Sequence, residues 1–360
     1  MAFNSRTIFP ATFAAAAFVA IAAAPALASN VAGADILREW NLVVLGDLVS
    51  SSEVEGRTFV GGDLSGNSSN YNIQPVAPSA NGQPGLTVVG NVNGGHKNLN
   101  NGSGAVVGGN VNSGFNLNGA PQTVQVGGTI QNTNVNQNTV KSNIGATNPQ
   151  FVQDLKQQAS HIATSTLNLS HEMSTLGANS QLTFQGNKGV FNAQPDANGV
   201  AVFNISAADL DRIGEIQFNL NGADTAIVNV AGKSITLNDN FLGGTNNLGE
   251  NVIWNFPDAE TLKLTTAWGG SVLAPKAAAE TGNYIQGSAV FGSLVQNGEM
   301  HVGTYKGGYT PPPPSSSSSG GNTSSGGSSG GSEVPAPGVL GMFAAAAAAI
   351  FVLRRRRATN

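Results

Sequence analysis

A three-residue motif, glycine followed by a polar residue and an aliphatic one, recurs through the first third of the chain and restricts the folds that the chain can adopt. The copies are Gly46-Asp47-Leu48, Gly62-Asp63-Leu64, Gly90-Asn91-Val92, Gly109-Asn110-Val111 and Gly128-Thr129-Ile130, at successive spacings of 16, 28, 19 and 19 residues. Each follows a short β-branched or aromatic run, which predicts a strand that ends in a sharp turn. Recurrence near 20 residues is typical of a solenoid.

Polarity alternates with a period of two inside these repeats. Four triplets place one aliphatic residue between two asparagines: Asn91-Val92-Asn93, Asn98-Leu99-Asn100, Asn110-Val111-Asn112 and Asn116-Leu117-Asn118. In a strand this sends the aliphatic side chain to one face and both amides to the other. One rung buries too few aliphatic groups to offset its lost conformational entropy, so rungs must stack. We therefore predict a mostly β chain, a β-helix or β-solenoid. The outward asparagines form either amide ladders or turns, and their tolerance of left-handed geometry favours turns.

One helix is expected to flank this stack. Asn148 is its predicted N-cap, Pro149 suits the first turn, and the helix runs to about Ser165 or a little further. Its apolar face comprises Phe151, Val152, Leu155, Ala159, Ile162 and Ala163. A stripe at this spacing is typical of a helix that packs against a core. We expect it to cover one side of the solenoid.

Strands resume after the helix. They are predicted at 181–184, 200–205, 215–219, 225–230 and 251–256. Ser206 and Asp209 form a predicted capping box of a short helix or turn. The segments starting at Gly270 and Gly287 repeat Gly-Ser-aliphatic/Ala 17 residues apart. The second half therefore adds rungs to the same stack, and residues 29–310 form one domain.

Composition excludes several classes of protein. Only 10% of the residues are charged, and the chain has no cysteine, which rules out disulfides, thiolate zinc sites and thiol catalysis. Five of the 16 basic residues lie in the terminal segments; without them 11 Lys and Arg face 20 Asp and Glu, a balance of −9. A chain with this negative charge between its terminal segments is not expected to bind nucleic acid or other anionic partners.

The sequences at the two ends of the chain are typical of targeting signals. Residues 1–28 have a basic start at Arg6, an apolar core and an Ala-Leu-Ala cleavage site, as in a secretory signal peptide. Residues 311–333 form a Pro/Ser/Gly linker that cannot fold by itself. In residues 334–360 the apolar run Val339–Leu353 would make about 22 Å of helix, short for a membrane span of about 30 Å.

This last segment resembles the PEP-CTERM sorting signal of Gram-negative bacteria: Val-Pro-Ala-Pro, the apolar run, then four arginines. Ala336 stands where that motif has glutamate. The resemblance implies a membrane stage through Val339–Leu353, processing by an exosortase-type enzyme, and a producer that secretes exopolysaccharide. A plain C-terminal membrane anchor is the alternative. Either signal places the body at the cell surface or in the extracellular matrix.

Further segments resemble the choice-of-anchor A family over about residues 35–305. They are Gly46-Asp47-Leu48, Glu55-Gly56-Arg57, Val60-Gly61-Gly62-Asp63-Leu64, Val252-Ile253-Trp254-Asn255-Phe256-Pro257-Asp258-Ala259, Gly270-Ser271-Val272-Leu273-Ala274-Pro275-Lys276-Ala277, Ile285-Gln286-Gly287 and Gly298-Glu299-Met300-His301. The resemblance implies an adhesive, cell-surface domain and no catalytic residues.

Candidate functional side chains are few. The four histidines, His96, His161, His171 and His301, have no metal-ligand spacing. His301 and Glu299 share one strand face and could form a metal or acid/base pair; a structural pair near the end of the stack is favoured.

Acidic side chains give two more candidates. Glu53, Glu55 and Arg57 alternate on one predicted face, where a surface ion pair is favoured over a bound divalent cation. Asp47 and Asp63 recur at equivalent rung positions and could bind calcium between rungs. Asn and Thr replace them in later rungs, so capping of turns is favoured. We assign no catalytic, metal or cofactor site, and no cofactor.

Three functions fit these observations. The leading hypothesis is a non-enzymatic adhesive protein that binds neighbouring surfaces or exopolysaccharide through its amide-rich wall. A polysaccharide-cleaving β-helix enzyme would need carboxylates gathered on adjacent rungs in a cleft. An ice-binding protein would need a flat ladder of threonines, and only isolated cases such as Thr261, Thr265 and Thr266 occur.

Overall fold

The computed structural model describes residues 31–310. The predicted signal peptide, linker and sorting tail lie outside the described residues. Within 31–310 the chain forms 26 strands and five helices, almost all of the strands parallel to their neighbours, so the predicted solenoid-like, mostly β class is confirmed. None of the described helices is long and apolar enough to span a bilayer.

The first half winds through rungs that each contribute to three faces. The face beside the long helix, here called the helix face, holds β1 (Leu42–Val44), β4 (Thr58–Val60), β7 (Leu86–Val88), β9 (Ala105–Val107), β11 (Thr123–Val126) and β12 (Thr139–Lys141). The second face holds β2 (Leu48–Ser50), β5 (Leu64–Ser65) and single bridges at Val92, Val111 and Ile130. The third face holds β3 (Glu53–Val54), β6 (Ser69–Tyr71), β8 (Lys97–Leu99) and β10 (Phe115–Leu117).

The second half uses the same three faces with longer strands. The helix face continues with β15 (Val200–Ser206), β17 (Thr225–Ala231), β20 (Val252–Asn255), β23 (Ser271–Thr281) and β25 (Ala289–Gln296), and the last two run on into the second face. The second face adds β18 (Ser234–Leu237) and β21 (Thr261–Leu264). The third face adds β22 (Trp268–Gly269), β24 (Ile285–Gln286) and β26 (Met300–His301). A separate sheet holds β13 (Gln181–Gln185), β14 (Lys188–Asn192), β16 (Glu215–Asn219) and β19 (Asn240–Phe241).

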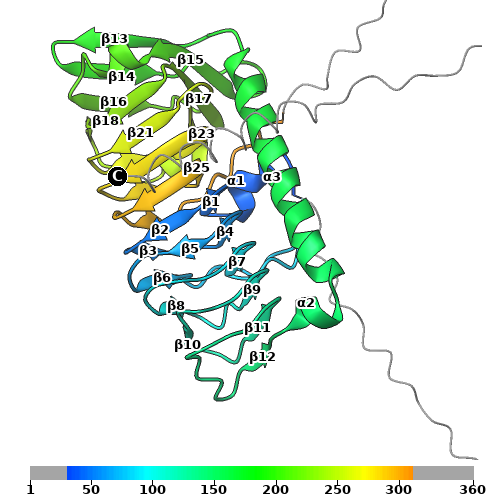
Figure 1. Cartoon of the computed structure of the whole chain (residues 1–360). Coiled ribbons are helices and arrows are strands. Elements are labelled where there is room, and N and C mark those ends of the chain that lie inside the picture. Colours follow the sequence, from blue (N-terminus) through cyan, green and yellow to red (C-terminus); the bar gives the residue numbers. More distant parts are fainter. Residues whose placement is uncertain (1–30, 311–360) are drawn as a thin grey trace, which may run out of the picture. The chain divides into compact units, whose positions relative to one another are not determined.

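The order of the rungs in space differs from their order in the chain. The first rung lies in the middle of the stack, because β1 pairs with β4 on one side and with β25 on the other. Residues 42–141 build away from this point in one direction. The helix then returns along the stack, and residues 181–301 build from the far end back to the middle (Figure 1). Second-half rungs do join the same sheet, but they dock on the first rung rather than on the last.

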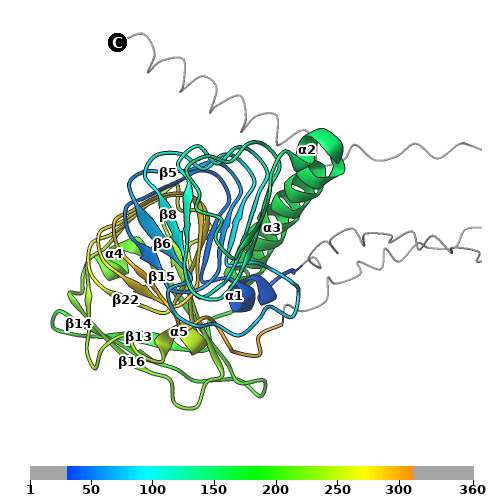
Figure 2. The same ribbon diagram turned by 90° about the horizontal axis from the view of Figure 1, so that it is seen from below.

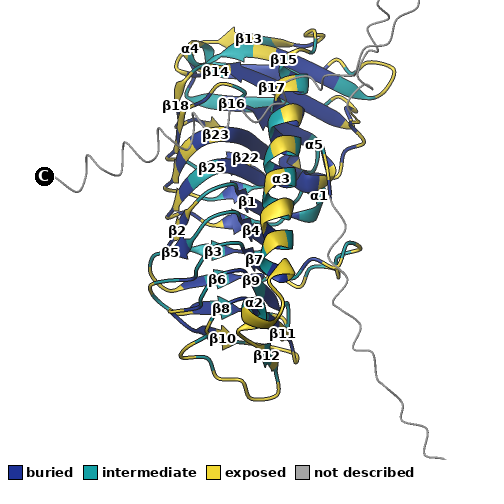
Figure 3. Ribbon diagram, turned by 45° about the vertical axis from the view of Figure 1, so that its right-hand side comes forward, coloured by how far each residue is buried: buried dark blue, intermediate teal, exposed yellow. Residues whose placement is uncertain are grey.

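Aliphatic side chains fill the lumen of the stack, as the alternation predicts. Leu48, Leu64, Val92 and Val111 are fully buried at equivalent positions of successive rungs. Figure 3 shows buried residues along the strands of the stack. In the second half aromatic side chains join the lumen, with Trp254 and Trp268 in edge contact at 4.9 Å between ring centroids. A polar or charged residue at any of these positions would be surrounded by apolar groups, so the pattern fixes which face of each strand points inward.

The long helix α3 spans Gln150–Ser174, so it ends nine residues beyond the predicted Ser165. Pro149 rather than Asn148 is its N-cap. Its buried residues are Phe151, Leu155, Ile162, Thr166, Leu169, Ser170 and Met173. Of these, Ile162, Leu169 and Met173 form a second hydrophobic cluster with outward-facing apolar side chains of the helix face such as Val43 and Ile253. The helix therefore covers this face along the stack, as expected (Figures 1 and 2).

Four short helices complete the described chain: α1 (Asp35–Glu39), α2 (Ile144–Thr147), α4 (Ala207–Leu210) and α5 (Leu248–Asn251). The predicted capping box begins α4, since the Ser206 hydroxyl accepts the Asp209 N–H and the Asp209 carboxylate accepts the Ser206 N–H.

A ladder of three asparagines holds the C-terminal part of α3. Asn204, Asn229 and Asn255 occupy the same register position on β15, β17 and β20. Asn255 donates to the Ser170 carbonyl at 2.8 Å, and Asn229 donates to the Met173 carbonyl at 2.8 Å. The Leu176 N–H already donates to the Met173 carbonyl at 3.2 Å, so these amides add bonds to the last turns of the helix and tie its end to the helix face.

Asn41 joins the two halves of the stack at the seam between β1 and β25. Its fully buried side chain donates to the carbonyls of Gly287 and His301 at 2.8 and 2.9 Å, and accepts the Gly56 N–H at 2.9 Å. One amide therefore links backbone segments more than 240 residues apart. The bonding capacity of an asparagine suits this role, because it offers two donors and an acceptor in one plane.

Candidate functional site

Side-chain amides form ladders on two faces of the first half. On the second face Asn112 donates to Asn93 at 2.8 Å. On the third face Asn116 donates to Asn98 at 2.7 Å, and Asn118 donates to Asn100 at 3.1 Å. Parallel in-register pairing places the amides about 4.8 Å apart along the stack, within hydrogen-bonding reach.

The turn-forming interpretation of these asparagines is wrong. The left-handed positions belong to other residues: Asn72, Asn101, Asn132, Asn136, Asn143, Asn221 and Asn247. Of the triplet asparagines, Asn98 and Asn116 lie in β8 and β10, and the others flank a strand or a single bridge. Their side chains bond from rung to rung. Spacing alone could not separate these roles, because a turn asparagine and a ladder asparagine both recur once per rung.

Asp47 and Asp63 cap the next rung, as predicted. The Asp47 carboxylate accepts the Asp63 N–H at 2.9 Å, and the Asp63 carboxylate accepts the Asn91 N–H at 2.7 Å. Asn91 and Asn110 continue the series through the N–H of Asn110 and Thr129. Asp and Asn are interchangeable here because each supplies a carbonyl-type oxygen acceptor. The preceding glycines allow this close approach: a Cβ at Gly62 would lie 2.3 Å from the Asp47 carboxylate.

The seam gathers most of the acidic candidates on the third face. Because Val54 pairs with Met300, Glu53 lies beside Glu299 and Glu55 beside His301. The Glu299 carboxylate bonds the His301 ring at 2.8 Å, and that ring stacks on Tyr284 with centroids 4.4 Å apart. The structural pair is thus observed, in the middle of the stack rather than near its end.

The other two carboxylates of this seam already accept hydrogen bonds from neighbouring groups. Glu53 accepts the Asn70 amide at 3.0 Å, and Glu55 accepts the Val302 N–H at 2.6 Å. The Glu299 side chain is 51% exposed, so this part of the third face is open rather than enclosed. Across residues 31–310, no three His, Asp or Glu side chains lie close enough together to hold a metal ion.

The predicted ion pair among Glu53, Glu55 and Arg57 is not formed. Arg57 lies at the corner before β4 and faces Glu39, with 3.6 Å between nitrogen and oxygen. It also donates to the Ala77 carbonyl. Burial lowers the pKa of Arg57, and the nearby Glu39 carboxylate opposes that shift. The alternation of residues 53–57 failed to predict this contact because β3 ends at Val54 and the chain turns before Arg57.

The remaining sequence candidates lie apart. His96 bonds the Asn132 carbonyl in a turn, and His161 lies on α3. Thr261 donates to Ser234, while Thr265 and Thr266 donate to the carbonyls of Leu237 and Asp239. These threonines bond individually at the edge of the second face and do not form a ladder.

Two buried ionisable groups were missed from the sequence. Asp239, between β18 and β19, is fully buried, and neither carboxylate oxygen has a hydrogen-bond partner among the described residues. Desolvation and then the Asp211 charge raise its pKa to about 7. Lys97 is fully buried on β8, and desolvation lowers its pKa to about 8. The period-two alternation of buried and exposed residues predicts that both side chains point inward. The prediction of core residues from this pattern covered apolar residues only.

A family model described as "Putative Ice-binding-like adhesive domain" matches residues 33–302. No curated protein and no solved structure matches the chain. The family match extends over nearly all of the described solenoid, from the turn before α1 to the residue after β26. The chain therefore belongs to this ice-binding-like adhesive domain family.

Proposed function

We propose that this chain is an exported, non-catalytic adhesive protein whose solenoid wall binds neutral polysaccharide outside the cell. The observation that carries the proposal is the set of amide ladders on the second and third faces, Asn93–Asn112, Asn98–Asn116 and Asn100–Asn118. Hydrogen bonds already fix these amides in register. A ligand that bonds to them therefore costs little ordering of the protein.

The chemistry of the wall favours a neutral, hydroxyl-rich ligand. Except for Asn100, whose Nδ2 also donates to the carbonyls of Tyr71 and Asn98, the ladder amides keep donor and acceptor capacity after their ladder bonds. Sugar hydroxyls both donate and accept. The acidic balance of the body opposes binding to polyanions. Adhesive family membership agrees with a binding role.

The location of the protein is part of the same proposal. Residues 1–28 would direct export, and residues 334–360 would hold the chain at the membrane until an exosortase-type enzyme processes it. The intervening linker, 311–333, would then let the solenoid stand away from the cell surface. This arrangement fits the choice-of-anchor A resemblance of the body.

Retention on immobilised polysaccharide tests the binding function. The purified full chain would be passed over the exopolysaccharide of the producing organism, over dextran and mannan, and over polygalacturonate as an acidic probe. We expect retention by neutral polymers, and at least about tenfold weaker retention after Asn98→Ala with Asn116→Ala. Thr236→Ala, an exposed change on β18, is the matched control. Failure of wild type to bind any neutral polymer would refute the proposal.

Polysaccharide cleavage is the second candidate, because Glu53 and Glu299 lie on neighbouring rungs and glycoside hydrolysis uses two carboxylates. Their existing bonds to Asn70 and His301, on an open face, make us rank it below adhesion. Size-exclusion chromatography of the polymer after incubation distinguishes the two. Shortening by wild type that Glu299→Gln abolishes would favour the enzyme; unchanged length favours adhesion.

Ice binding is third. It would require a flat column of threonines, and the outward column of the second face runs through Ser234, Thr261 and Ala278. This mixed sequence does not supply the repeated methyl and hydroxyl groups that such a column needs.

A further inference from the structure

The longest corner loop of the first half is larger than the solenoid requires. Residues 72–85 connect β6 to β7 in 14 residues, whereas the next two rungs make the same connection with five, 100–104 and 118–122. This extra length accounts for the spacing of 28 between two repeats. A rung can therefore close without the additional segment, and the segment calls for a separate explanation.

The loop is held in one conformation by groups from three other parts of the chain. Arg57, beside β4, donates to the Ala77 carbonyl. Asn81 donates to Glu39 of α1 at 2.9 Å, and Gln158 of α3 donates to the Gln83 side chain at 3.1 Å. Prolines at 75, 78 and 84 further restrict its backbone. A loop ordered in this way loses little conformational entropy when a ligand binds to it.

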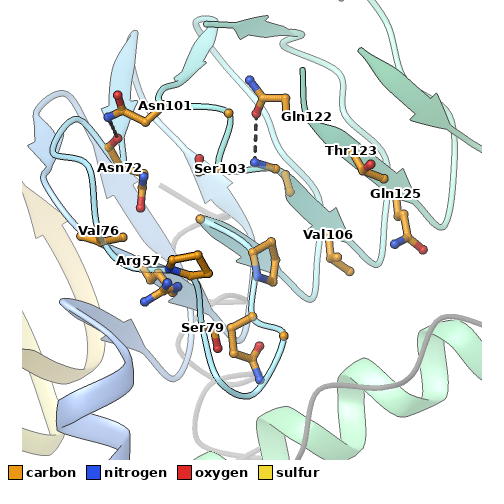
Figure 4. Close-up of a pocket in the computed structure, with 18 of the residues that line it drawn as sticks. Arg57, Asn72, Val76, Ser79, Asn101, Ser103, Val106, Gln122, Thr123 and Gln125 are labelled. Carbon is orange, nitrogen blue, oxygen red and sulfur yellow. Dashed lines mark hydrogen bonds between the residues drawn. The ribbon is translucent and has the colours of Figure 1, made fainter. Parts of the chain in front are cut away.

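A cavity of about 600 Å³ lies between this loop and the corners of the next two rungs (Figure 4). Its size falls in the range of small-ligand sites. Gln83 of the loop, Asn101 and Ser103 of the second rung, and Gln125 of β11 contribute polar groups to its lining. Pro84 and Pro121 contribute apolar ring surfaces. Arg57 is the one charged residue among those described as lining it, and Glu39 faces that charge.

Three polar atoms of the lining residues remain unpaired. Asn72 Oδ1, Gln83 Nε2 and Ser103 Oγ are buried and have no hydrogen-bond partner within residues 31–310. They comprise an acceptor, a donor and a hydroxyl that does both. Buried polar groups without partners are uncommon in folded proteins. A hydroxyl-bearing molecule in the groove would pair with them once small side-chain rotations turn these atoms toward it.

We infer that this groove is a binding site for a neutral sugar unit of a polysaccharide chain, an assignment that rests on the proposed adhesive function. Sugar hydroxyls match the mixture of donors and acceptors, and the C–H faces of a sugar ring can pack on the proline rings. The groove would select one unit of the polymer, while the amide ladders bind the extended chain with less discrimination.

The second cavity beside the loop fits such a ligand less well. Its volume is about 640 Å³, and its lining includes Arg38, Glu39, Glu250 and Lys306. These charges are engaged with neighbouring groups, as in the Lys306–Glu250 pair at 2.5 Å. A neutral sugar would have to compete with those ion pairs, whereas Arg57, paired with Glu39, is the one charged residue in the lining of the groove.

Two groove variants of the full chain test the assignment. Gln83→Leu removes the unpaired donor together with the bond from Gln158, and Val106→Arg places a long side chain in the groove from β9, where Val106 is half-buried. Thr236→Ala is the control on a distant face. Binding to tetrasaccharides of glucose, mannose and galactose, and to tetragalacturonate, would be measured by ligand-observed NMR, and retention on the matching polymers in parallel. Thermal melting confirms that each variant is folded.

The expected result is binding of at least one neutral tetrasaccharide that both folded groove variants weaken about tenfold, the effect of losing one good hydrogen bond. The control should bind like wild type. If wild type is retained by polymers but no tetrasaccharide binds, or the groove variants bind as wild type does, the groove assignment is overturned while adhesion stands. Preference for tetragalacturonate also overturns it. If wild type is not retained by any neutral polymer, the proposed function itself fails.

Discussion

The buried carboxyl of Asp239 should make the stability of the solenoid depend on pH. Its pKa is raised from 3.8 to about 7 by desolvation and by the charge of Asp211. Between these values the folded chain holds a proton that the unfolded chain has lost, so stability falls as pH rises through this window. Each pKa unit is worth about 1.4 kcal/mol, and three units give about 4 kcal/mol of destabilisation above pH 7.

Replacing Asp239 with asparagine removes this ionisation and keeps the size of the side chain. Wild type and Asp239→Asn should be equally stable near pH 4, and the variant should be more stable by up to about 4 kcal/mol at pH 8. For a domain of this size that difference corresponds to a rise in melting temperature of about 8 °C. Calorimetry across pH 4–8 measures it, with the exposed Asp258→Asn as control. An equal pH dependence in wild type and Asp239→Asn would refute the reasoning.

Three further substitutions test the hydrogen bonds and close contacts that hold the stack together. Asn41→Ala leaves the Gly56 N–H and the Gly287 carbonyl unpaired at the seam and removes one of two bonds to the His301 carbonyl, so denaturant unfolding should show a loss of about 2–4 kcal/mol. Ser51→Ala, which loses one exposed bond, should cost under about 0.5 kcal/mol. Gly62→Ala forces a Cβ against the Asp47 carboxylate and should cost about 1–3 kcal/mol, whereas Gly177→Ala meets nothing within 4 Å and should be neutral; equal melting temperatures would contradict this. Asn255→Leu removes the amide bound to the Ser170 carbonyl, so hydrogen exchange should speed up at the C-terminal end of α3 and stay unchanged near Gln150; uniform protection along the helix would be the contrary result.

Local pattern predicted the rungs because each depends on residues close together in the chain. The period-two alternation identified Val92, Leu99 and Val111 as lumen residues, and the repeated Gly-Asp/Asn identified the corner caps. Both are consequences of strand geometry and of the acceptor oxygen that Asp and Asn share. The α3 boundary was less accurate, because polar Thr166 and Ser170 interrupt the apolar stripe yet are buried against the helix face.

The order of the rungs could not be predicted in the same way. Every rung presents similar backbone edges to the next, so nothing in the local repeat distinguishes docking of residues 289–296 on the first rung from docking on the last. The contacts that specify the seam, such as Asn41 with His301 and Ser50 with Gln296, join residues with no fixed spacing. For the same reason the sequence did not predict that Glu53 and Glu299 lie side by side, because only the strand pairing at this seam brings them together.

Crosslinking across the seam tests the central claim most directly, because the chain has no cysteine of its own. Val49 on β2 and Val295 on β25 are in register, and both are exposed, at 42% and 44%. Adjacent strands place their Cα atoms within the range that a disulfide can bridge. Val49→Cys with Val295→Cys should form an intramolecular disulfide on mild oxidation, seen as faster migration in non-reducing gels. Val49→Cys with Thr236→Cys, on the same face but several strands away, should not. Absence of the first crosslink, or equal formation of the second, would contradict the stack in which the last rung closes on the first.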